Sequence, residues 1–146
     1  MRLDQGFFNT WTPRALAMLR IVTAFLYLQH STAKLLGVPH VADFDQLPAL
    51  SIIGFAGLLE IVGSLLIFLG LFTRPTAFIL SGEMAVAYFM EHAPKGHFFA
   101  PALNGGEEAI LYCFIFLFLS AAGTGAWSID ANRTRNHANA ADRRTD

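Results

Sequence analysis

The sequence predicts an all-α fold, a transmembrane four-helix bundle whose N and C termini both lie in the cytoplasm. Two observations predict the bundle: 54% of the 146 residues are hydrophobic, and most of the chain falls into long apolar runs. A third observation, the placement of the basic residues, predicts the orientation. The apolar runs lie at Ala15–Leu36, Ala49–Phe72, Ala77–Met90 and Ala109–Ala122.

Each run, with its flanks, can form a helix that crosses a bilayer. A hydrocarbon core about 30 Å thick takes roughly 20 apolar helical residues. The expected spans are residues 15–36, 49–72, 75–92 and 105–123, all within a single domain over residues 1–130. Residues 131–146 are polar and rich in Arg, Asn and Asp, so we expect a disordered cytoplasmic tail there.

Helix-start signals support the third and fourth spans. Pro75 follows a short turn, and proline suits the first turn of a helix. Glu107 and Glu108 open the fourth span, where a helix N-terminus favours negative charge. The first span begins late for a secretory signal, at Ala15, and Arg20 interrupts it, so we expect this helix to stay in the mature protein.

The basic residues predict which side of the membrane the termini occupy. The two loops expected outside hold only Lys34, near a helix end, and Lys95. Cytoplasmic segments collect Lys and Arg, so the arginine-rich side should be cytoplasmic. That side carries Arg2, Arg14, Arg74, Arg133, Arg135, Arg143 and Arg144.

Composition also excludes several classes of function. A net charge of −1 argues against electrostatic affinity for nucleic acid. Cys113 is the lone cysteine, so the chain has no CxxC motif, no intrachain disulfide and no paired metal thiolates. We therefore expect no metal centre, and we interpret Cys113 as a small buried apolar residue.

The first span has one polar face. Its polar residues follow one another at spacings of three and four, which places them on one side of an α-helix and away from lipid. Two interpretations remain open. The face can associate helices through polar contacts, or it can line a ligand site or a proton path. Its members are Arg20, Thr23, Tyr27, Ser31 and Lys34.

Two acidic residues fall inside the second and third spans. Glu60 lies mid-span between Gly57 and Gly63, which allow another helix to approach closely, and Glu83 lies in the third span. A carboxylate at this depth is costly unless it is paired or protonated. Similar depth predicts that Arg20 meets Glu83, with Glu60 either sharing Arg20 or staying protonated.

A second polar layer is expected at the outer end of the bundle. Lys34 ends the first span, and Asn104, Glu107 and Tyr112 lie at or near the start of the fourth. We expect Lys34 to form an ion pair with Glu107 or Glu108. The alternative is an ordinary interfacial charge cluster.

Three histidines also lie at this outer level: His30, His92 and His97. Two of them could ligate a haem from facing helices. No haem motif accompanies them, and interfacial histidines are common, so we do not expect haem.

A series of short motifs in a fixed order resembles the DoxX family of small bacterial four-helix membrane proteins, over about residues 14–130. The closing motif reads Gly-Thr-Gly-Ala-Trp-Ser where the family often has Gly-Pro-Gly-x-x-Ser, a mild departure. The motifs are Arg20, Lys34-Leu35 with Gly37, Gly57-x-x-Glu60-x-x-Gly63, Gly70-Leu71-Phe72-Thr73-Arg74, Met84-Ala85, Asn104-Gly105-Gly106-Glu107 and Gly123 to Asp130.

The resemblance implies a multi-pass protein of the bacterial inner membrane that is associated with redox work. Some DoxX proteins are subunits of a thiosulfate:quinone oxidoreductase, and others are linked to oxidative-stress complexes or to quinone and catechol resistance. By position, the resemblance carries over the family's recurrent polar residues Arg20, Lys34, Glu60, Asn104 and Glu107.

We therefore expect a quinone-linked subunit of a membrane oxidoreductase or oxidative-stress complex, without a complete catalytic set of its own. Tyr27, Glu60 and Arg20 are expected to contact the head group of a quinone. The alternatives are a membrane scaffold for a partner enzyme and a small proton or solute transporter. Expected partners are the lipid bilayer, quinone, and a protein partner or further copies of the chain. The candidate ligand-binding or buried polar residues are Arg20, Tyr27, Lys34, Glu60, Glu83, Asn104, Glu107 and Tyr112.

Overall fold

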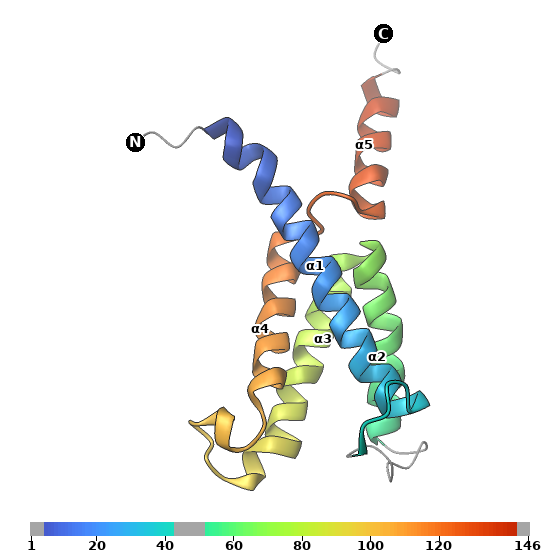
Figure 1. Cartoon of the computed structure of the whole chain (residues 1–146). Coiled ribbons are helices and arrows are strands. Elements are labelled where there is room, and N and C mark those ends of the chain that lie inside the picture. The colour runs from blue at the N-terminus through green and yellow to red at the C-terminus, as the bar shows by residue number, and fades with distance from the viewer. Residues whose placement is uncertain (1–4, 43–51, 143–146) are drawn as a thin grey trace.

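The structure, a computed structural model, describes residues 5–42 and 52–142. These residues form helices, turns and loops and contain no strand, which confirms the all-α prediction (Figure 1). Short 3-10 turns at Ala93–Lys95 and Pro101–Leu103 lie between α3 and α4. The main helices are α1 (Gln5–Leu36), α2 (Ile52–Leu69), α3 (Thr73–Ala87), α4 (Glu107–Ala122) and α5 (Ile129–Asp142).

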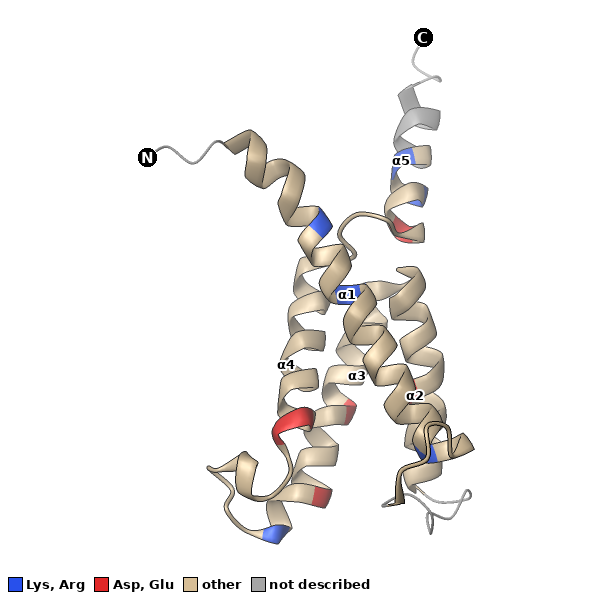
Figure 2. Ribbon diagram, viewed as in Figure 1, with Lys and Arg blue, Asp and Glu red and all other residues tan. Residues whose placement is uncertain are grey.

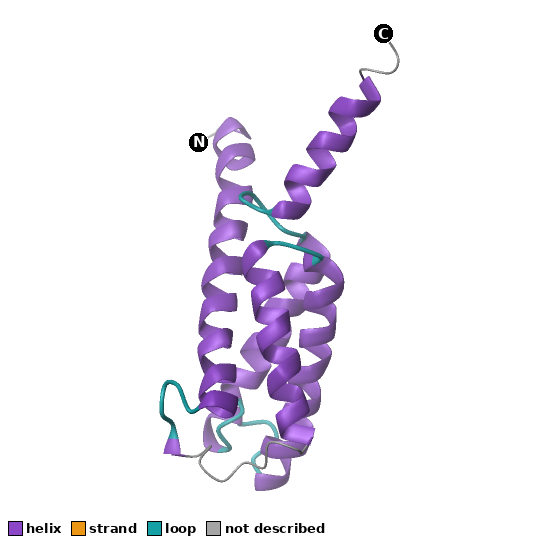
Figure 3. Ribbon diagram, turned by 90° about the vertical axis from the view of Figure 1, so that its right-hand side faces the viewer, coloured by secondary structure: helices purple, strands orange, loops and turns teal. Residues whose placement is uncertain are grey.

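The first four helices lie side by side. Helix α1 packs against α2, α2 against α3, and α3 against α4, with a smaller contact between α1 and α4 (Figures 1 and 3). Helix α5 stands beyond the end of this group, on the side where α1 begins (Figure 3). The first and last helices therefore place both ends of the chain at one end of the molecule.

The helix boundaries differ from the expected spans in part. Helix α1 begins at Gln5, well before Ala15, and includes Pro13. Helix α3 continues into a π-helix at Tyr88–His92, so the third helical segment ends where the third span was expected to end. Residues 49–51 of the expected second span lie outside the described residues.

The C-terminal segment differs most from expectation. Residues 131–146 are predicted to be disordered, whereas Ile129–Asp142 is helical, and residues 143–146 lie outside the described residues. Local signals account for the helix, because Ser128 Oγ accepts the Ala131 N–H at 3.1 Å as an N-cap and Asp130 lies in the first turn. These capping signals outweigh the polar composition on which the prediction rested.

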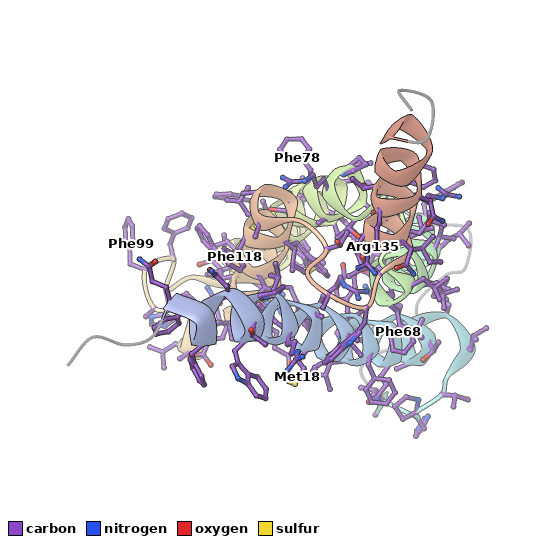
Figure 4. The ribbon with its side chains drawn as sticks, turned by 90° about the horizontal axis from the view of Figure 1, so that it is seen from above. Met18, Phe68, Phe78, Phe99, Phe118 and Arg135 are labelled. Carbon is purple, nitrogen blue, oxygen red and sulfur yellow. The ribbon has the colours of Figure 1, made fainter. Side chains whose placement is uncertain are left out.

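The outer faces of the helices carry large apolar side chains. Phe55, Phe78 and Phe114 are exposed, and Figure 4 shows Met18 and Phe78 pointing away from the helices on opposite sides. Exposed apolar surface of this extent marks a membrane or partner interface. By length and composition alone, α2 is the one helix among the described residues that is sufficiently apolar to cross a membrane.

Glycines on α2 bring the helices close to one another around Glu60. A Cβ atom at Gly57 would lie 2.8 Å from Leu35 Cγ, and one at Gly63 would lie 2.7 Å from Leu80 Cδ2. Both distances are below van der Waals contact, so α2 fits against α1 at Gly57 and against α3 at Gly63 only because these positions lack side chains. Glu60 lies between the two glycines on the same face and is therefore held between α1 and α3.

Candidate functional site

Four side chains from three helices meet inside the bundle, and we call them the acid cluster: Tyr27 and Lys34 of α1, Glu60 of α2 and Glu83 of α3. Lys34 Nζ lies 2.6 Å from Glu60 Oε1 in an ion pair. The Tyr27 hydroxyl donates to Glu83 Oε2 at 3.2 Å. Glu60 and Glu83 also interact electrostatically with each other across this site. The cluster thus links α1, α2 and α3 through charged and polar atoms.

The polar face predicted for the first span forms one side of this cluster. Arg20, Thr23, Tyr27 and Ser31 are buried and Lys34 is half-buried, which confirms that this face turns inward. The small hydroxyls are used locally. Ser31 donates to the Tyr27 carbonyl at 2.7 Å, and Ser64 donates to the Glu60 carbonyl at 2.6 Å. The long side chains are therefore the ones that connect the helices.

Two carboxyl oxygens of the acid cluster are buried without a hydrogen-bond donor. They are Glu60 Oε2 and Glu83 Oε1. The Glu60 side chain is 1% exposed and the Lys34 side chain 12%, so the Glu60 carboxyl group is closed off from bulk solvent. Buried polar atoms in folded proteins nearly always have a partner, and an exception indicates strain or a chemical role.

Aromatic rings of α4 close the cluster on its remaining side. The Tyr27 ring lies 4.9 Å from the ring of Tyr112 and 5.0 Å from that of Phe116, measured between centroids. Tyr112 and Phe116 stack on each other at 6.0 Å. Tyr112 therefore contacts the cluster through its ring, and these rings give the acidic residues an apolar boundary.

Arg20 pairs with no acidic side chain among the described residues, so the expected Arg20–Glu83 contact is wrong. The guanidinium is fully buried and donates to backbone carbonyls of two separate segments. Nη1 donates to Ile67 and Phe68 of α2 at 2.6 Å each, and Nη2 donates to Trp127 at 2.9 Å. Nε donates to Thr124 at 2.9 Å, and Nη2 makes a longer contact of 3.5 Å with Ala126.

These contacts occupy the N–H groups that a guanidinium possesses, so little remains for a ligand. The carbonyls at the C-terminus of a helix lack partners within that helix. Arg20 satisfies two of them at the end of α2 and ties that end to the segment after α4. We therefore interpret Arg20 as a structural cap and no longer as a head-group residue.

The expected pairing of Lys34 with Glu107 or Glu108 is also wrong, because Lys34 pairs with Glu60. Both glutamates are exposed in the first turn of α4. Asn104 shapes the loop before α4: its Nδ2 donates to the Gly96 carbonyl at 3.2 Å, and its Oδ1 accepts the Gly106 N–H at 2.9 Å. Asn104 therefore holds the loop that leads into the first turn of α4.

Sequence reasoning missed two charged residues that act at the same end as Arg20, and we call the three the capping group: Arg20, Arg74 and Asp130. Arg74 donates to the carbonyls of Ser120 and Ala121 at 3.1 and 2.6 Å, at the end of α4. Asp130 accepts the backbone N–H groups of Phe72 and Thr73, where α3 begins. A charged residue immediately after a helix-ending Gly-Leu-Phe-Thr turn is the signal that could have identified Arg74.

Charge is distributed unevenly along the molecule. Figure 2 shows basic segments on α1 and α5 toward the end where α1 begins, with an acidic segment at the start of α5. It shows acidic segments on α3 and α4 toward the opposite end, where basic segments lie as well. A cavity of about 520 Å³ opens beside the capping group and is lined by Arg74, Asp130 and Arg133 among others.

Within the described ranges, no three His, Cys, Asp or Glu side chains gather as metal ligands.

Comparison with known proteins identifies the family. The DoxX family model matches residues 15–93, just over half of the chain. The chain belongs to the DoxX family. It is also 48% identical over 122 residues to an uncharacterized protein of Haemophilus influenzae, which covers 82% of this chain and 91% of that protein. No solved structure matches the chain.

DoxX membership supports a membrane protein, in agreement with the exposed apolar faces of the helices. The matched region contains every member of the acid cluster and also Arg20. Asn104, Glu107 and Tyr112 lie beyond it.

Proposed function

We propose that this DoxX protein crosses the bacterial inner membrane through α1–α4, with both termini in the cytoplasm, as a subunit of a quinone-linked oxidoreductase or oxidative-stress complex. The four-span arrangement is supported by exposed apolar side chains on each of these helices. The orientation is supported by the arginines, which concentrate at the end where α1 begins and α5 lies. Phe7, Phe8 and Trp11 are exposed on the first turns of α1, as residues of a membrane–water interface would be.

The acid cluster is the observation that carries the redox proposal. Reduction of a quinone to a quinol takes two electrons and two protons, and the electrons would come from a redox group of a partner enzyme. Lys34 and Tyr27 are hydrogen-bond donors that suit quinone carbonyl oxygens, and Glu60 and Glu83 are groups that can hold and release protons. An ionisable group inside a membrane is a candidate for a functional site, and here two of its oxygens also lack a donor.

The test is enrichment of quinone by the protein in its native lipid. The full chain is extracted from bacterial membranes into lipid nanodiscs, and quinone per protein is measured by mass spectrometry against nanodiscs of an unrelated membrane protein. We expect enrichment in the wild type and its loss in Lys34→Met and Glu60→Gln. Glu91→Gln, at an exposed acid in the π-helix that follows α3, should behave as wild type.

Equal quinone in all samples would overturn the quinone-linked role. A partner enzyme retained equally by every variant, without quinone enrichment, would favour the scaffold function. Proton flux into proteoliposomes that Glu60→Gln abolishes would favour transport, for which the buried carboxyl groups are also suited.

A further inference from the structure

We infer that Glu60 and Glu83 bind one proton between them, so that the acid cluster is a one-proton site inside the bundle. Each carboxyl group has one oxygen already engaged, Glu60 Oε1 by Lys34 and Glu83 Oε2 by Tyr27. The second oxygen of each is buried without a donor. Two ionised carboxylates can only accept hydrogen bonds, so neither could satisfy the other.

A single proton resolves the arrangement. If Glu83 Oε1 carries it, the protonated group becomes a donor that can form a charge-assisted hydrogen bond with Glu60 Oε2, the other oxygen that lacks a donor. The network then runs in one direction: Tyr27 donates to Glu83, Glu83 to Glu60, and Lys34 to Glu60. Every oxygen of both carboxyl groups has a partner.

The charge balance of the acid cluster also favours one bound proton. Lys34 is the ammonium that contacts the pair, so two ionised glutamates would leave one uncompensated negative charge among apolar rings. Two carboxyl groups that share one buried site cannot both ionise freely, because their negative charges repel each other. One shared proton makes the cluster neutral. The other titratable groups that face it within the described structure are His30 of α1 and Tyr112 and Glu108 of α4.

The inference does not depend on quinone. Because the two carboxyl groups titrate as a unit, the proton belongs to the pair and leaves only when the pair ionises fully. A group that takes up and releases one proton inside the bundle would serve quinone reduction or proton transfer equally.

Infrared spectroscopy of the full-length protein in lipid nanodiscs tests the shared proton. A protonated carboxyl group has a C=O band separate from that of carboxylate, and glutamate labelled with carbon-13 shifts the band and assigns it. At neutral pH we expect a protonated-glutamate band in the wild type and in Glu91→Gln. Its absence from the wild type would overturn the inference, whatever the variants do.

Variants distinguish a shared proton from one held by a single residue. In Glu83→Gln we expect the remaining Glu60 to ionise and pair with Lys34. In Glu60→Gln we expect the remaining Glu83 to ionise and pair with Lys34. The protonated-glutamate band should therefore disappear from both variants. Persistence of the band in either variant would contradict sharing. In Lys34→Met both carboxyl groups lose their counter-charge, and the band area should rise about two-fold as each takes a proton. An unchanged area there would also contradict the inference.

The proposal of quinone binding can be disproved separately from the shared proton. A band that follows the expected pattern without quinone enrichment would leave the proton site intact and remove only the redox proposal.

Discussion

The capping group and the acid cluster both bury charge, but they differ in how completely their atoms are satisfied. Arg20 is fully buried and directs its N–H groups at backbone carbonyls of α2 and of the segment after α4. Glu60 is equally buried, yet one of its oxygens has no donor. A buried charge with every atom paired serves the fold, whereas one with an open atom has capacity left for chemistry. Charge and depth alone do not separate the two.

The same contrast extends to what each group joins. The capping group contacts backbone at helix ends, and its members hold the ends of α2, α3 and α4 in place. The acid cluster joins side chains to side chains, with Lys34 contributed by the last turn of α1. Side chains can change partner or protonation state without unwinding a helix, so only the acid cluster can alternate between states while the fold persists.

The largest expected effect comes from breaking the capping group at its centre. Arg20→Met leaves the carbonyls of Ile67, Phe68 and Trp127 without donors in a buried site. We expect a loss of about 3–5 kcal/mol in the free energy of unfolding, as when one partner of a buried charged network is removed. Thermal unfolding in mild detergent, followed by circular dichroism, measures it.

Arg20→Lys should recover little of that loss, because an ammonium is a point donor and cannot span two carbonyl segments as a guanidinium does. Arg14→Gln is the matched control, because Arg14 is an exposed arginine on the same helix as Arg20. Full stability of Arg20→Met would show that the capping contacts contribute nothing, and the comparison with the acid cluster would lose its basis.

A double-mutant cycle at Lys34 and Glu60 tests the ion pair of the acid cluster. Lys34→Met removes the ammonium that lies 2.6 Å from Glu60, and we expect a loss of about 1–3 kcal/mol, because a charged hydrogen bond is lost and an acceptor is left buried. Adding Glu60→Gln should restore part of this loss, since the amide needs no counter-charge. Losses that simply add would mean that the two side chains do not interact in the membrane.

The sequence predicted the fold class and the inward polar face of α1, because helical spacing determines which residues share a face. It also placed Glu60 correctly between two close-packed glycines. It did not predict the partners. Depth along a helix indicates which side chains lie at one level, but the carbonyls that bind Arg20 belong to a helix end and a loop whose conformation no spacing reveals. Lys34 was expected at the outer surface, whereas its long side chain reaches back along α1 to Glu60.

A smaller effect is expected at Asp130, which caps α3 from outside that helix. Asp130→Ala removes the acceptor for the backbone N–H groups of Phe72 and Thr73. Loss of a helix cap costs about 1 kcal/mol. Thermal unfolding should show a decrease of that order, while Asn132→Ala, at an exposed position in the same turn of α5, should unfold as wild type. Equal stability of the two variants would place Asp130 outside the capping group.

The smallest effect is expected at Glu107, where it decides between the two arrangements considered for Lys34. Glu107 is exposed in the first turn of α4, so its neutralisation in Glu107→Gln should cost at most about 0.3–1 kcal/mol through the helix dipole. Lys34→Met should cost the same in this background as in the wild type, because the two side chains are not paired. If Glu107→Gln instead abolished the effect of Lys34→Met, Lys34 would have Glu107 as its partner, Glu60 would be left without a counter-charge, and the acid cluster would need a second proton.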